Sequence, residues 1–97
     1  MKSPDTRYII EYKEQFIKDV LNHKKAGRNT ILMKVNSLVN ELEKHPTFGT
    51  GKPEALKGNR KGQWSRRITK GHRLTYEIHE DLKTVLIISA SGHYGAR

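Results

Sequence analysis

Apolar residues recur at helical spacing through most of the first half of the chain. Ahead of them, residues 8–12 are β-branched and aromatic, which predicts a short strand or the lead-in to a helix. The first helical stripe follows the spacing i, i+1, i+4, i+5 and consists of Phe16, Ile17, Val20 and Leu21. We expect this helix to end at Gly27, because the left-handed conformation of a helix stop costs glycine least.

A second stripe is longer and more regular, and it predicts the clearest helix in the chain. Its apolar positions repeat at intervals of three and four residues, and are Ile31, Leu32, Val35, Leu38, Val39 and Leu42. Asn29 or Thr30 can cap its start, and Pro46 prevents it from continuing much beyond Lys44. With about three residues between them, the two helices are expected to form a helical hairpin.

Prolines and glycines interrupt the pattern between residues 45 and 62, which predicts a structured loop. Within it we expect one helical turn at residues 54–57. The run Gly49-Thr50-Gly51-Lys52 is too short for a phosphate-binding loop and leads into no long helix, so we interpret it as loop geometry.

Beyond the loop the apolar period becomes two, which predicts half-buried strands with Arg66 as the one discordant residue. A three-residue turn at residues 70–72 would place Ile68 opposite Leu74. The same register puts Arg67 and Arg73 together on the other face of the sheet, because strand side chains alternate between faces.

The last predicted strand, residues 83–89, is apolar on both sides and is expected to be central. The order β-α-α-β-β-β predicts an α+β fold of two layers, with the N-terminal helical hairpin packed on a twisted, mostly antiparallel sheet. We expect residues 1–97 to form a single domain. The chain has no cysteine, no signal-peptide pattern and no apolar run long enough to cross a bilayer, so we expect a cytoplasmic protein without a membrane partner.

The net charge of +9 points to a binding surface. Residues 1–48 carry a net charge of +3 and residues 49–97 a net charge of +6. Between Lys44 and Tyr76 the sole carboxylate is Glu54, which lies among eight lysines and arginines. Such a stretch predicts a surface for a polyanion, most commonly nucleic acid. A solvated basic face and a surface for an acidic protein partner are the alternatives.

Several residues of the basic stretch and the C-terminus suit metal-free cleavage of RNA. That reaction needs a base for the ribose 2′-OH, cations for the phosphate and an acid for the departing 5′-oxygen. Glu54 is a candidate base, Arg67 and Arg73 are candidate phosphate ligands, and His93 is a candidate acid with Tyr94 beside it. Each also has a plain structural interpretation as a solvated ion pair, a basic face or an exposed terminal side chain. No histidine pair has metal-ligand spacing, so we predict neither a metal nor a cofactor.

Four blocks of sequence resemble the YoeB (also called Txe) group of bacterial toxins in the RelE/ParE superfamily. They are residues 46–57 (PTFGTGKPEALK), 64–68 (WSRRI) and 72–76 (HRLTY), followed by His93-Tyr94. Their order and spacing are specific, and they lie in a region that covers about half of the chain. The resemblance implies the RelE/ParE-like fold, with two helices on a mostly antiparallel sheet. It also implies the activity of an mRNA interferase, an endoribonuclease that cuts the message in the ribosomal A site and so inhibits translation.

The resemblance further implies a catalytic role for four residues. Glu54 would be the general base and Arg73 would stabilise the phosphorane-like transition state. His93 would be the general acid, and Tyr94 would help to place the RNA. Glu54, which composition had already set apart as a lone carboxylate among cations, is thus also the base that the resemblance implies.

Contacts with RNA phosphates are implied for Lys57 and Arg67. We also expect Lys52 and Arg66, from the same basic stretch, to contact RNA. The implied partners are mRNA in the A site, the ribosome, and a YefM-like antitoxin whose acidic segment covers the basic groove. We consider a homodimer as well.

Two other functions remain alternatives at this point. A ParE-like toxin would share the fold but inhibit DNA gyrase, and it would need no acid–base pair. A non-catalytic nucleic-acid-binding module would bind with a steep salt dependence and tolerate loss of the Glu54 carboxylate.

Overall fold

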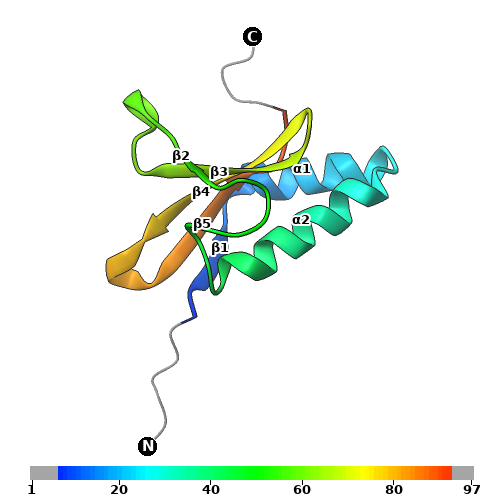
Figure 1. The fold of residues 1–97 in the computed structure, drawn as a ribbon. Helices are drawn as coiled ribbons and strands as arrows, with labels where there is room; N and C mark the ends of the chain where they lie inside the picture. The colour runs from blue at the N-terminus through cyan, green and yellow to red at the C-terminus, as the bar shows by residue number, and fades with distance from the viewer. Residues whose placement is uncertain (1–6, 93–97) are drawn as a thin grey trace, which may run out of the picture.

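The computed structural model describes residues 7–92, which form one layer of two helices and one layer of strands (Figure 1). The helices are α1 (Glu14–Lys25) and α2 (Asn29–Leu42). The strands are β1 (Ile9–Tyr12), β2 (Glu54–Ala55), β3 (Gln63–Thr69), β4 (His72–His79) and β5 (Thr84–Ser89). Two short 3₁₀ turns, η1 (Gly58–Arg60) and η2 (Glu80–Leu82), complete the described elements.

The strands form one mixed sheet in the order β1-β5-β4-β3-β2. β1 pairs with β5 in parallel, and the other neighbouring pairs are antiparallel. This arrangement confirms the predicted α+β fold with its mostly antiparallel sheet. It also settles the first apolar segment as a strand and places β5 inside the sheet, as predicted.

The helical hairpin has the predicted position, with residues 26–28 between the helices. Gly27 adopts a φ of 70°, so the left-handed stop at the end of α1 is confirmed. The predicted cap of α2 was wrong. The capping position is Arg28, which makes no side-chain capping bond, and both candidate residues lie within the helix. Neither helix of the described residues is long and apolar enough to span a membrane.

The core lies between the helices and one face of the sheet. α1 packs on β5 and α2 packs on β3, so each apolar stripe covers a different part of that face. The large apolar side chains that are fully buried at this junction are Leu38, Leu42, Leu74, Tyr76, Val85 and Ile87. Burying a side chain of this size contributes roughly 1.5–3 kcal/mol, so this interface accounts for much of the fold's stability.

Two local predictions differ from the structure. Residues 54 and 55 form the strand β2, which pairs with β3, instead of starting a helical turn. In the β3–β4 hairpin, Leu74 lies opposite Arg66, and a bulge occurs at Ile68, so the predicted pairing of Ile68 with Leu74 was wrong. The predicted faces are nevertheless correct, because the true register differs by two residues and two is the strand period.

Candidate active site

The outer face of the sheet, on the side away from the helices, carries a row of polar residues across its strands. Tyr76 and Leu74 point into the core, so their neighbours on β4, Thr75 and Arg73, point to this outer face. Pairing across the sheet then places three further residues in one row with Thr75, because cross-strand partners share a face. These residues are Glu54 on β2, Ser65 on β3 and Ser89 on β5.

Two arginines form the next row on the same face. Arg67 on β3 lies directly opposite Arg73 on β4, one step nearer the hairpin turn than the row that contains Glu54. Arg67 is exposed and Arg73 is partly exposed. Like charges directly opposite each other destabilise a sheet, so this pair is a costly arrangement that a bound anion would relieve. The structure therefore confirms that Arg67 and Arg73 share one face, and it places Glu54 on the same face by a strand pairing that the sequence did not predict.

The loop that leads into β2 lies against β3 and determines where Glu54 enters the sheet. The Arg67 N–H donates to the Gly51 carbonyl oxygen at 2.6 Å. Gly51 has a φ of 84°, and a Cβ atom there would lie 2.9 Å from the Arg67 carbonyl oxygen. Glycine is therefore required by both backbone conformation and space. Lys52 follows with a φ of 51° and an exposed side chain, and Lys57 is also exposed beyond β2. The glycine-rich run is thus loop geometry, as interpreted from the sequence.

Arg66 is fully buried, so the prediction that it contacts RNA was wrong. Its guanidinium and Nε–H groups are hydrogen-bonded within the protein. The acceptors are Glu41 Oε1 at 2.7 Å, Tyr76 Oη at 3.2 Å and the carbonyl oxygens of His45, Phe48 (2.9 Å) and Thr50 (3.2 Å). Five bonds match the five N–H donors of an arginine side chain. Arg66 thus organises the loop before Glu54.

Two further groups complete this buried arrangement, which we call the Arg66 network. The Tyr76 hydroxyl donates to the Pro46 carbonyl oxygen at 2.7 Å, and the Thr50 N–H donates to Glu41 Oε1 at 2.9 Å. Partial burial would raise the pKa of Glu41, but the hydrogen bonds from Thr50 and the charge of Arg66 hold that pKa below its ordinary value. Burial raises the pKa of Tyr76 despite the nearby guanidinium.

The chain that leaves β5 passes beside Arg73. The Arg73 N–H donates to the Ser91 carbonyl oxygen at 2.9 Å, and Gly92 lies against Gly71 in the β3–β4 turn. Figure 1 shows this end of the chain beside the hairpin. The predicted acid His93 and its neighbour Tyr94 lie outside the described residues.

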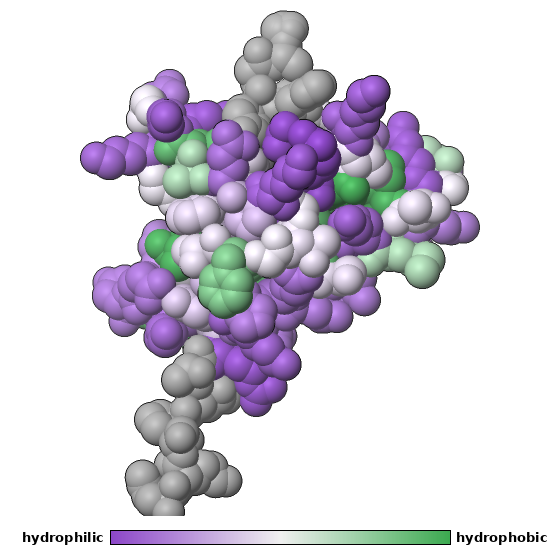
Figure 2. Space-filling model, viewed as in Figure 1, coloured by the Kyte–Doolittle hydropathy of each residue, from purple (hydrophilic) through white to green (hydrophobic). Residues whose placement is uncertain are grey.

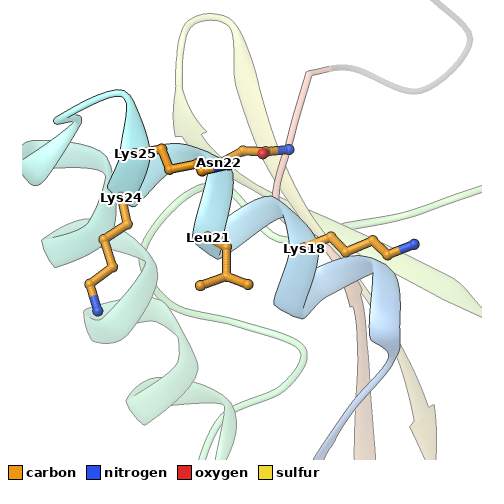
Figure 3. A pocket seen from close by; sticks show the side chains of 5 residues that line it. All are labelled: Lys18, Leu21, Asn22, Lys24 and Lys25. Atoms are coloured by element: carbon orange, nitrogen blue, oxygen red, sulfur yellow. The ribbon is translucent and has the colours of Figure 1, made fainter.

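Other features of the surface offer less chemistry. The face of the molecule in Figure 2 is dominated by hydrophilic residues, with small, separate apolar patches. A hollow on the helical layer is lined by Lys18, Leu21, Asn22, Lys24 and Lys25, all from α1 (Figure 3). Within residues 7–92, no group of three or more histidine, aspartate or glutamate side chains could hold a metal ion.

Sequence reasoning missed Glu41 and Tyr76 as partners of Arg66. One signal was available, since an arginine at an apolar position of a strand must find buried acceptors. The separation of 25 residues between Arg66 and Glu41 hid the identity of the acceptor. Asp19 and His23, two buried polar residues on α1, were also missed.

Comparison with known proteins assigns the family. The family model for YoeB-like toxins of bacterial type II toxin–antitoxin systems matches residues 12–94. Toxin YoeB of Escherichia coli K12 is 45% identical over 64 residues, which cover 66% of this chain and 74% of that protein. The YoeB/ParE toxin from Agrobacterium tumefaciens has a TM-score of 0.82 at 30% identity, over 89% of this chain and 99% of that one. YoeB from Staphylococcus aureus was solved as a dimer and in complex with YefM, and these two structures give TM-scores of 0.78 and 0.76. Each is 31% identical and covers 91% of this chain and 99% of that one. The chain therefore belongs to the family of YoeB-like toxins of bacterial type II toxin–antitoxin systems.

Proposed function

We propose that this toxin is an endoribonuclease that cuts mRNA in the ribosomal A site by acid–base catalysis. The observation that carries the proposal is the position of Arg67 and Arg73 on the outer face of the sheet. The strand order places Glu54 on the β2 side of this pair and the chain at Ser91 on its β5 side. A phosphate held by the arginines would thus have a carboxylate on one side and the segment leading to His93 on the other.

The proposed reaction combines these groups. The Glu54 carboxylate takes the proton of a ribose 2′-OH, and the 2′-oxygen attacks the adjacent phosphorus. The bond from phosphorus to the 5′-oxygen breaks, and that oxygen takes a proton from His93. The products are a 2′,3′-cyclic phosphate and a 5′-OH, and the proposed chemistry requires no metal or cofactor.

The arginines supply the electrostatic part of catalysis. Arg73 stabilises the negative charge that grows on the phosphate oxygens, and Arg67 positions the phosphate beside it. Lys52 and Lys57, both exposed and close in sequence to Glu54, extend the cationic surface along the RNA. Tyr94 helps to place the RNA next to His93.

The two proposed partners that contact the cationic face, mRNA and the antitoxin segment, are both negatively charged. The ribosome presents the mRNA, which places the activity in the cytoplasm, and a YefM-like antitoxin covers the cationic face with an acidic segment when the toxin is silent. Self-association to a homodimer is a further proposed assembly.

A cleavage assay on programmed bacterial ribosomes with a defined A-site codon tests the proposal. Wild type, Glu54→Gln, Arg73→Ala and His93→Gln are compared, and the cut site is mapped by primer extension. We expect the Arg73 variant to cut at least about 10²-fold more slowly than wild type. Lys24→Ala is the matched control, since it also removes one positive charge but lies on α1, and it should cut at the wild-type rate.

Other outcomes would overturn the proposal. Cleavage by Glu54→Gln and His93→Gln at the wild-type rate would remove the acid–base mechanism. A folded wild-type protein that cuts no message but inhibits DNA gyrase would be a ParE-like toxin.

A further inference from the structure

Two buried side chains on α1 bind the backbone of a single residue at the end of β5. Asp19 is 4% exposed and His23 is 2% exposed, and they lie one helical turn apart. The Ala90 N–H donates to Asp19 Oδ2 at 2.9 Å. His23 Nε2 lies 2.6 Å from the Ala90 carbonyl oxygen. We call these two contacts the Ala90 clamp.

The hydrogen bonds around the clamp fix its polarity. An Arg28 guanidinium nitrogen lies 3.1 Å from His23 Nδ1, and because arginine can only donate, Nδ1 accepts. His23 therefore carries its proton on Nε2 and donates it to Ala90. The other oxygen of Asp19, Oδ1, accepts from the Gln15 amide at 2.8 Å. Each half of the clamp is thus held in place by a second residue of the helical hairpin.

The clamp lies just beyond the end of β5, where α1 rather than a neighbouring strand supplies the hydrogen-bond partners of the backbone. Ala90 is fully buried and directly follows β5, and buried backbone groups must be hydrogen-bonded. Two ionisable side chains are a costly way to meet this need, because each must itself be taken out of water. On the other side, the next carbonyl oxygen, that of Ser91, accepts from the Arg73 N–H. The chain is therefore fixed between α1 and β4.

We infer that Asp19 and His23 are positioning residues for the C-terminal His93-Tyr94 pair. The inference rests on the proposed function, in which His93 is the general acid. His93 follows Ala90 by three residues, which can span at most about 10 Å, so a shift at Ala90 changes where the acid can reach. We expect the clamp to act on the leaving-group step of the reaction, because Glu54 lies on β2, on the other side of the arginine pair.

An RNA with sulfur in place of the scissile 5′-oxygen tests this role. A thiolate leaves without a proton, so this substrate makes the general acid unnecessary. With the normal RNA on programmed ribosomes, Asp19→Ala should lower the single-turnover rate about 10- to 100-fold, within the usual contribution of acid catalysis, while ribosome binding stays at the wild-type level. With the sulfur substrate, its rate should return to within about three-fold of wild type. Asp19→Asn keeps an oxygen acceptor for the Ala90 N–H and should retain most of the activity on normal RNA.

Control variants separate the inference from folding and from the proposed function. Lys24→Ala, on the same helix, should match wild type on both substrates. His23→Leu removes the other half of the clamp and fills its place with an apolar side chain. If circular dichroism shows that Asp19→Ala does not fold, the two substrates are compared with His23→Leu instead. His93→Gln should show the same rescue by sulfur, and if it does not, the acid role in the proposed function fails.

The inference is overturned by either of two results when His93→Gln is rescued. One is a clamp variant that cuts both substrates equally slowly, which would make its role purely structural. The other is a clamp variant that cuts normal RNA at the wild-type rate.

Discussion

Replacing Arg66 with methionine is expected to be among the most damaging single changes in the described fold. The substitution keeps an unbranched side chain but removes five hydrogen bonds from a residue that is fully buried. Removing one partner of a buried ion pair costs about 3–5 kcal/mol. Glu41 remains 28% exposed and keeps the Thr50 N–H, so we expect the lower end, about 3 kcal/mol. For a domain of this size that loss lowers Tm by about 12–24 °C.

Urea unfolding followed by the fluorescence of Trp64, which lies on the same strand, measures this loss. Arg67→Met is the matched control, because it removes the same guanidinium from the next residue, whose side chain is exposed on the outer face. We expect that control to change the unfolding free energy by no more than about 0.5 kcal/mol. If the two variants lose the same stability, or if Arg66→Met stays within about 1 kcal/mol of wild type, the structural role of the Arg66 network is refuted.

Three further predictions concern the loop and the cationic face. The pKa of Glu41 is lower in the folded state, so its contribution to stability is present above the ordinary value of 4.5 and is lost as pH falls through the folded pKa. In Glu41→Gln, the unfolding free energy measured in urea should therefore change less with pH below 4.5 than it does in wild type. Gly51→Ala should cost about 1–3 kcal/mol by thermal unfolding, and more than Gly58→Ala, since both glycines have positive φ but a Cβ at Gly58 meets nothing within 4 Å. Arg67→Ala should reduce the slope of log affinity against log salt by about 0.7 for single-stranded RNA, measured by fluorescence anisotropy, whereas Lys24→Ala should leave the slope unchanged.

The parts of the fold that sequence predicted are those set by local periodicity. The stripe from Ile31 to Leu42 determines both the length of α2 and the face that it buries, and the structure agrees at both. The alternation around Arg67 and Arg73 determines which side chains share a face. That prediction survived an error in the register, because the error was one full strand period.

The parts that sequence missed depend on contacts between distant residues. Residues 54 and 55 are extended because β3 offers them an edge, and that edge is invisible to a local reading of the loop. Asp19 and Ala90 are 71 residues apart, so the clamp leaves no local pattern. The cap expected at Asn29 or Thr30 failed for a similar reason, since tertiary packing stabilises α2 without a side-chain cap.

The neighbouring arginines of β3 show why the fold and the proposed site cannot vary independently. Alternation along the strand sends Arg66 inward and Arg67 outward, so one residue type serves two purposes at adjacent positions. The inward position requires arginine, because the three donors of a lysine cannot meet five acceptors. The outward position requires a cation for phosphate, which lysine can supply in part. A slip of one residue in β3 would exchange these roles, placing an unpaired charge in the core and removing the loop that holds Glu54 beside the arginine pair.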